Sequence, residues 1–318
     1  MNVRRSLLSL TLAAIVALPA AYHVLFVADS LPPEAELAID WTRIRTLAGP
    51  VNESPTTIRT DVVAHGAFFG WMICAGCGWD EVPMEFRTHQ LVYANGRTVV
   101  IDAVHDAERH AAMPMMRDYD PAAFLRQTEA LRRADRILLT HEHWDHSNGL
   151  RAVIDDPAVR ERIWLPQAQR DSAAMRDSGL EAGQLLGLPP TGEVAMQKVA
   201  PGVVVIPMPG HTPGSQVVYV RRADGVELLF LGDIVWNARN LRERRGKSRL
   251  IGWVAGEDAS ALRDQIAYFA DLAEGSGRSA WNFVVAHDPE QNARLVARGV
   301  LVSGLAIAVQ PPLFPNEL

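Results

Sequence analysis

The hydrophobic pattern of the chain first becomes regular between residues 86 and 102. Two short apolar runs, Leu91-Val92-Tyr93 and Val99-Val100-Ile101, flank the dipeptide Asn95-Gly96. This dipeptide is a strong local signal for a two-residue hairpin turn, because Asn and Gly both tolerate positive φ. Residues 86–102 are therefore predicted to form a β-hairpin.

Helices and strands alternate after this hairpin. Phe124, Leu125 and Leu131 fall on one face of a helix predicted at residues 121–134. The other predicted elements are strands at residues 137–139, 163–165, 203–207, 216–220, 228–231 and 281–286, and a helix at residues 259–273. Such alternation predicts an α/β protein. Residues 103–120 and 237–257 fit neither pattern and are expected to be loops over a site.

A different pattern occupies the N-terminal residues. Arg4 and Arg5 precede residues 6–28, which contain no Asp, Glu, Lys or Arg and are numerous enough to cross a bilayer as a helix. We expect an uncleaved anchor in the inner membrane with the body of the protein on the periplasmic side, because positive charge precedes the apolar run and acidic residues follow it. The alternatives are a signal peptide that is cleaved near residues 19–21, which would release the protein into the periplasm, and a buried core helix.

Four prolines among mixed polar residues mark residues 31–58 as a linker with at most one short helix. The expected organisation is therefore an N-terminal signal or anchor at residues 1–30, this linker, and one folded domain at residues 59–318.

Composition and charge narrow the classes of function. The chain has 318 residues, of which 48% are hydrophobic and 21% charged, as in folded globular proteins. Its formal net charge of −6 has the wrong sign for a surface that binds polyanions, which argues against nucleic acid as a partner. The two cysteines, Cys74 and Cys77, are compatible with a short-loop disulfide, with free thiols, or with part of a further metal site.

Histidines and carboxylates gather at the ends of predicted strands. Imidazole mixed with carboxylate is the ligand set that zinc selects, and the carboxyl ends of strands in α/β sheets collect functional loops. More candidate ligands are present than one metal ion needs. They lie in the segments His141-Glu142-His143-Trp144-Asp145-His146, Gly210-His211-Thr212-Pro213-Gly214, Gly232-Asp233 and Ala286-His287-Asp288.

In this order, the motifs H-x-H-x-D-H, G-H-T-P-G-S, G-D and A-H-D resemble those of the metallo-β-lactamase-fold hydrolases, over about residues 86–290. The resemblance implies a four-layer αβ/βα sandwich with two divalent metal ions, expected to be Zn²⁺, between its two sheets. It further implies that the first metal is bound by His141, His143 and His211. The second metal would be bound by Asp145, His146 and His287, and Asp233 would bridge the two metals.

The implied activity is hydrolysis of an ester, thioester or lactone of a small-molecule substrate. Two cations that share a water molecule would bring its pKa toward neutrality and supply a hydroxide nucleophile, with Asp145 or Asp233 as the catalytic carboxylate that carries the proton. Asp233 points to the branch that resembles hydroxyacylglutathione hydrolases and lactonases, because the β-lactam hydrolases of this fold generally lack it. His143 argues against the redox diiron relatives, which carry glutamate there. The oligomeric state stays open.

Two alternatives remain. One is β-lactam or sulfate-ester hydrolysis on the same fold. The other, from a different class, is a non-catalytic sensor at the membrane that binds a metal or a ligand.

Some positions depart from the family pattern or stay uncertain. Residues 287–291 are similar to the H-D-x-E-Q of lactonases, but Trp236 occupies the place of their tyrosine three residues after the bridging aspartate. An indole cannot give up its proton as a phenol does, which counts against homoserine-lactone hydrolysis. Glu142 lies at a variable position. Further candidates are Thr140, Thr212, Ser215 and Asp288 for orienting imidazoles, His105 for substrate contact, and Met113, Met115, Met116, Trp236 and Trp253 for lining a pocket.

Overall fold

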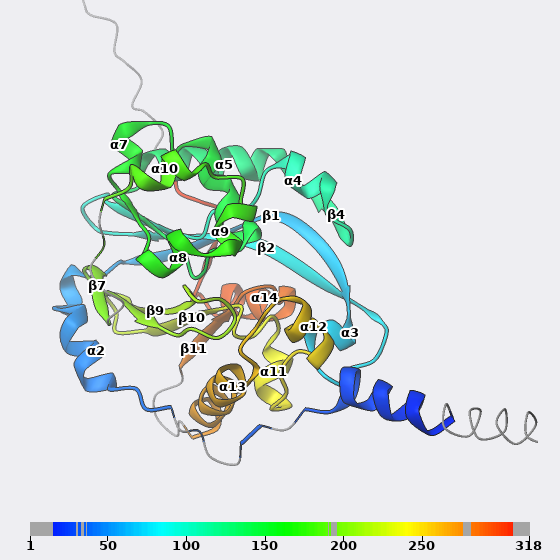
Figure 1. The fold of residues 1–318 in the computed structure, drawn as a ribbon. Helices are drawn as coiled ribbons and strands as arrows, with labels where there is room; N and C mark the ends of the chain where they lie inside the picture. Colours follow the sequence, from blue (N-terminus) through cyan, green and yellow to red (C-terminus); the bar gives the residue numbers. More distant parts are fainter. Residues whose placement is uncertain are drawn as a thin grey trace, which may run out of the picture.

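The computed structural model describes residues 15–29, 31–32, 35, 37–189, 191, 196–275 and 281–307. In this part of the chain two β-sheets face each other and helices cover their outer faces (Figure 1). The first sheet has the strand order β12-β1-β2-β3-β5-β6, with β4 paired to β1, and the second has the order β11-β10-β9-β8-β7. The expected α/β class and four-layer sandwich are confirmed.

The strands have these bounds. The first sheet contains β1 (Thr57–Phe69), β2 (Glu81–Val92), β3 (Thr98–Ile101), β4 (Met116–Tyr119), β5 (Arg136–Leu138), β6 (Ile163–Trp164) and β12 (Val302–Ser303). The second sheet contains β7 (Gln197–Ala200), β8 (Val203–Pro207), β9 (Gln216–Arg221), β10 (Glu227–Gly232) and β11 (Asn282–Val285).

The helices range from one turn to several turns. The longer ones are α2 (Trp41–Ala48), α5 (Pro121–Arg133), α13 (Ala259–Glu274) and α14 (Pro289–Ala297). The shorter ones are α3 (Gly70–Ile73), α4 (Ala107–Ala112), α6 (Trp144–Ser147), α7 (Pro157–Arg160), α8 (Gln167–Asp171), α9 (Ala173–Asp177), α10 (Ala182–Leu186), α11 (Ala238–Arg242) and α12 (Arg249–Val254). The structure also contains a π-helical turn η1 (His23–Val27) and two 3-10 helices, η2 (Val51–Glu53) and η3 (Asn148–Ala152).

The central strands are apolar at nearly every position because they are buried on both faces. In β9, Val218 and Val220 join the core between the two sheets, whereas Val217 and Tyr219 join the core under α2 and α13. Successive side chains of a strand point to opposite faces, so a strand enclosed on both sides has no solvent-facing position for polar residues. This burial explains why the sequence pattern locates these strands well.

The segment expected to be a linker contributes side chains to the folded core. Asp40 caps α2 by accepting a hydrogen bond from the main-chain nitrogen of Arg43 at 2.9 Å. Ile44 and Ala48 of α2 are fully buried against the second sheet, and Ile58 of β1 lies fully buried between the sheets. From residue 37 onward this proline-rich stretch therefore packs on the domain.

Other predicted boundaries need correction. The segments 103–120 and 237–257, expected to be loops, contain α4, β4, α11 and α12. The buried face of α5 is formed by residues such as Ala123 and Leu131, whereas Leu125 is 68% exposed. Leu125 lies next to Phe124 in the sequence and is therefore rotated away from the sheet.

The N-terminal helix lies at the edge of the molecule. Residues 15–22 are α-helical and continue into η1, beside α3 and α12 (Figure 1). Residues 6–14 of the predicted anchor lie outside the described residues. Among the residues that are described, no helix is long and apolar enough to cross a membrane.

We predict that Ile44→Ala lowers the free energy of unfolding by about 2–5 kcal/mol, because it leaves a cavity between α2 and the second sheet. The matched control is Arg43→Ala, which changes an exposed neighbour on the same helix. Denaturant unfolding of both variants measures the difference. Equal stabilities would show that α2 is not part of the cooperative core.

Candidate metal centre

The seven predicted ligands lie in segments that follow strands. His141 and His143 lie between β5 and α6, and Asp145 and His146 belong to α6. The remaining three are His211 in the connection from β8 to β9, Asp233 directly after β10, and His287 two residues after the end of β11. Because β10 and β11 are parallel neighbours, their carboxyl ends bring Asp233 and His287 to one edge of the sheet.

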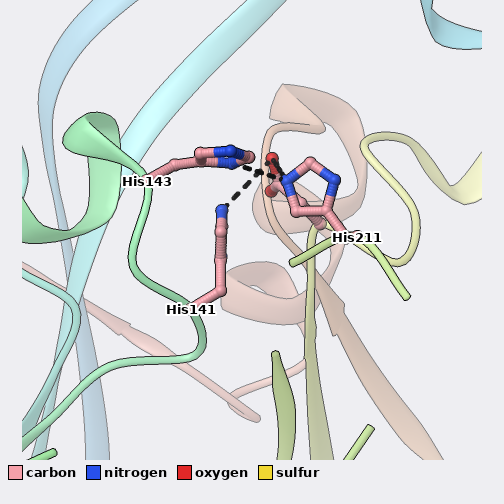
Figure 2. A group of neighbouring side chains, drawn as sticks. His141, His143 and His211 are labelled. Atoms are coloured by element: carbon pink, nitrogen blue, oxygen red, sulfur yellow. Dashed lines mark hydrogen bonds and ion pairs between the residues drawn. The ribbon is translucent and has the colours of Figure 1, made fainter. Parts of the chain in front are cut away.

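One group of ligands surrounds the Oδ2 atom of Asp233. The Nε2 atoms of His211 and His141 lie 3.4 Å and 3.7 Å from this oxygen. The Nδ1 atom of His143 lies 2.8 Å from the Nε2 atom of His211. The three imidazoles converge from two separate loops, as Figure 2 shows.

A second group surrounds the Oδ1 atom of the same carboxylate. The Nε2 atoms of His287 and His146 lie 3.1 Å and 3.4 Å from Oδ1 of Asp233. Oδ2 of Asp145 lies 3.6 Å from each of these two imidazole nitrogens. The structure thus brings all seven predicted residues together, with Asp233 between the two groups.

The residues at this centre fit a pair of divalent metal ions. Within each group the candidate ligand atoms lie within 4.8 Å of one another. Nε2 of His141, Nε2 of His146 and Oδ1 of Asp233 are buried and have no hydrogen-bond partner among the described residues. Buried polar atoms without partners cost free energy unless a ligand satisfies them, and this set of nitrogen and carboxylate donors suits zinc-like cations.

At Asp233 and His141 the electrostatics favour the protonation states that bind cations. Burial raises the pKa of Asp233, but the imidazoles around it, His287 foremost, outweigh burial and hold this pKa well below its ordinary value. Burial and the neighbouring His146 lower the pKa of His141 well below its ordinary value. An ionised carboxylate beside a neutral imidazole is the form in which both groups bind a metal.

Comparison with known proteins identifies the family. A family model described as the metallo-beta-lactamase superfamily matches residues 90–280, which is more than half of the chain. The chain belongs to the metallo-β-lactamase superfamily. The resemblance seen in the motifs is therefore confirmed.

Two curated proteins match parts of the chain. The hydroxyacylglutathione hydrolase of Albidiferax ferrireducens is 31% identical over 136 residues, which cover 42% of this chain and 47% of that protein. A probable metallo-hydrolase of Mycobacterium bovis is 27% identical over 209 residues, which cover 57% of this chain and 64% of that protein. The matched regions therefore span less than two thirds of either relative.

Solved structures share the fold. A quorum-quenching N-acyl homoserine lactone lactonase has a TM-score of 0.59 and 16% identity, covering 76% of this chain and 95% of its own. A probable metal-dependent hydrolase from Staphylococcus aureus has a TM-score of 0.53 and 13% identity, covering 74% of this chain and 90% of its own. At such identities the likeness concerns the fold alone.

A buried carboxylate that no sequence motif marked orients one of the candidate ligands. The side chain of Asp102 lies 2.9 Å from Nδ1 of His146 and accepts hydrogen bonds from the main-chain nitrogen and the hydroxyl of Thr140. With its proton on Nδ1, His146 presents the lone pair of Nε2 to the centre. The one sequence signal for Asp102 is its place at the end of an apolar strand.

Glu142 joins two of the ligand loops. This side chain is fully buried, and it accepts hydrogen bonds from the hydroxyl of Thr212 at 2.8 Å and the main-chain nitrogen of Gly214 at 3.2 Å. A Cβ on Gly214 would lie 2.6 Å from Oε2 of Glu142, so the close approach requires glycine. A position that is variable in the family thus ties the His141–His146 loop to the His211 loop in this chain.

A third carboxylate supports His211 from the segment after α12. Oε1 of Glu257 lies 2.6 Å from Nδ1 of His211 and 2.5 Å from Nζ of Lys247. Lys247 also donates to the main-chain oxygen of Asp233 at 2.8 Å. Burial raises the pKa of Glu257, but Lys247 and His211 outweigh it and lower this pKa to about 2. The carboxylate therefore stays ionised and fixes the ring of His211.

The other residues proposed from the sequence to orient imidazoles or contact the substrate differ in what they contact. Thr212 and Ser215 hydrogen-bond to each other through their hydroxyl groups at 2.8 Å. Asp288 caps α14 and, within the described part of the chain, makes no hydrogen bond to an imidazole nitrogen. His105 is fully buried, with Nε2 placed 3.2 Å from Nδ1 of His110, so it is not a solvated loop residue. Trp236 donates its indole N–H to Oδ2 of Asp233 at 2.6 Å.

Two of the residues proposed to line a pocket, Met116 and Trp236, pack in one hydrophobic cluster. Trp253 is 79% exposed and lines a pocket together with Lys247 and Glu257.

We predict that Asp102→Asn weakens Zn²⁺ binding by about 10–100-fold, because an amide cannot serve as the acceptor for both Thr140 and His146. Competition with a chromophoric chelator measures the affinity. Asp118→Asn, an exposed carboxylate on β4, is the control and should bind as the unmodified chain does. An unchanged affinity in Asp102→Asn would remove this residue from the support of the centre.

Proposed function

We propose that this chain is a hydrolase that binds two divalent metal ions, with Zn²⁺ as the ion, and cleaves an ester, thioester or lactone. One observation carries the proposal: Asp233 presents one carboxylate oxygen to each of two groups of three ligands. Membership in the metallo-β-lactamase superfamily and the match to a hydroxyacylglutathione hydrolase support it.

The chain's own residues would divide the work between binding and proton transfer. Two cations bound there would supply Lewis acidity to a carbonyl oxygen and lower the pKa of a water molecule. Trp236 holds Oδ2 of Asp233 in place, and Asp102 and Glu257 hold the imidazoles. Asp145 is partly exposed, so Oδ2 of this residue can take the proton of the attacking water and pass it to the leaving group.

The substrate class follows from the leaving group. An alkoxide or a thiolate departs more readily than an amide nitrogen, so the proposed centre favours esters, thioesters and lactones. Trp236 stands where lactonases of this fold place a tyrosine, which counts against N-acyl homoserine lactones as the substrate. We therefore rank thioesters and simple esters first, consistent with the name of the matched relative.

We predict that His143→Ala lowers hydrolysis by at least about 10³-fold while the chain stays folded, because the first group loses one of its three imidazoles and with it several kcal/mol of transition-state stabilisation. His65→Ala, an exposed histidine on β1, is the matched control and should retain full activity. A panel of chromogenic esters, thioesters, lactones, β-lactams and sulfate esters measures turnover, and elemental analysis counts the metal.

Two metal equivalents, with turnover of ester-type substrates lost to a chelator, are the expected result. Full activity in His143→Ala, or turnover that a chelator leaves intact, would contradict the proposal.

The location of the domain is a second part of the proposal. We place it on the periplasmic side of the inner membrane, held by residues 6–28. The charge-free run behind Arg4 and Arg5 supports this location. So does the disulfide between Cys74 and Cys77, because disulfides persist in oxidising compartments.

Extraction of membranes with alkaline carbonate tests the anchor. The chain is expected to stay in the membrane pellet, as integral proteins do. Release of the chain into the supernatant would contradict an anchor at residues 6–28.

A further inference from the structure

One face of the domain exposes large apolar side chains around the N-terminal helix. Trp253 is 79% exposed, Val254 70% and Trp79 52%, and Phe69 at the end of β1 is also exposed. These four residues come from three separate segments, and we call them the aromatic face. Large apolar groups gathered on one surface of a folded protein mark a site of interaction.

The N-terminal helix lies against this face in a fixed position. The ring of Phe26 lies 4.9 Å from that of Trp71 and 5.5 Å from that of Trp79. The indole of Trp79 donates a hydrogen bond to the hydroxyl of Tyr22 at 3.1 Å. The main-chain oxygen of Phe26 accepts from the nitrogen of Gly76 at 2.8 Å. The end of the helix is therefore part of the domain surface.

The residue that follows the helix fixes its direction. The carboxylate of Asp29 accepts hydrogen bonds from the main-chain nitrogen of Gly246 at 2.5 Å and from Nε of Arg263 at 2.9 Å. The Asp29 side chain is only 4% exposed. Because this carboxylate is bound to two separate segments of the domain, its contacts restrict the angle between the helix and the domain.

The helix itself needs an apolar surrounding. Among the described residues of the charge-free run, large apolar side chains point to solvent on all sides of the helix, and Leu18 is 70% exposed. Ile15, Val16, Val24 and Leu25 are exposed as well. A helix that is apolar all round is stable when it is enclosed by protein or by lipid. The domain encloses only its last turns.

We infer that the aromatic face rests on a phospholipid bilayer, with Trp79 and Trp253 at the level of the headgroups. The helix ends against this face, so a bilayer that receives the helix also meets the face. Tryptophan is the residue that favours the boundary between headgroups and acyl chains. This inference rests on the proposed anchor and adds a second contact, made by the folded domain, to it.

Charge around the face agrees with a lipid partner. Arg242 and Arg249 expose their side chains on and beside α11 and α12, where anionic headgroups can reach them. Asp80 and Glu81 follow Trp79, and Glu81 is paired with Arg117 at 2.8 Å. The charges are mixed, so insertion of apolar side chains carries the contact and the arginines add to it.

The test uses the full chain reconstituted into vesicles of phosphatidylcholine with a minority of phosphatidylglycerol. Acyl chains that carry bromine quench tryptophan fluorescence only at short range. Trp253→Phe and Trp79→Phe are each expected to remove about half of the bromine-dependent quenching, because two indoles are placed at the bilayer boundary. Trp281→Phe is the matched control, since Trp281 packs against Trp41 of α2, on the other side of the molecule from the N-terminal helix (Figure 1). The bromine-dependent quenching of Trp281→Phe should equal that of the unmodified chain.

Three results would overturn the inference. If the chain does not float together with the vesicles in a density gradient, both the anchor and the contact of the aromatic face with lipid are contradicted. If the chain floats but its quenching is the same in Trp253→Phe and Trp79→Phe as in the unmodified chain, and acrylamide in water quenches these indoles, the anchor stands and the face meets water. If neither bromine nor acrylamide reaches them and cross-linking yields a dimer, the face is covered by a second copy.

Discussion

A single buried carboxylate holds the two halves of the candidate centre together. Oδ1 and Oδ2 of Asp233 face different sets of imidazoles, and the side chain is nearly inaccessible to solvent. A negative charge at this depth is stable only if positive or polarised groups surround it. The loops that carry the other six ligands have to close around this one residue, and each of them follows a buried strand or begins a short helix that gives it a firm base.

Buried carboxylates recur one layer further out. Asp102 contacts His146, Glu142 joins two loops and Glu257 contacts His211. Each accepts at least one hydrogen bond from the ligand loops, so the geometry of the centre is determined by contacts that do not themselves reach a metal. The ammonium group of Lys247 forms an ion pair with Glu257, so the buried negative charge of this third carboxylate is compensated.

The ligands could be predicted from the sequence because three histidines and one aspartate stand within six residues after an apolar strand, and the others follow apolar strands as well. The central strands could be predicted for the related reason that burial on both faces leaves continuous apolar runs. β1 could not, because its thirteen residues include polar side chains whose partners lie elsewhere. Asp61, for example, pairs with Arg126 of α5 at 2.7 Å. The roles of Asp102 and Glu257 could not be predicted for the same reason. They depend on residues far away in the chain, and no sequence spacing indicates them.

The ion pair of Asp29 with Arg263 has a mechanical consequence. A domain on a loose tether turns freely relative to its anchor, and its openings face every direction in turn. Here, rotation about the junction would have to break the contacts of Asp29 and separate Phe26 from Trp71 and Trp79. We therefore expect the last turns of the N-terminal helix to move together with the sandwich, so that a tilt at this junction also tilts the two sheets and the loops at their edge.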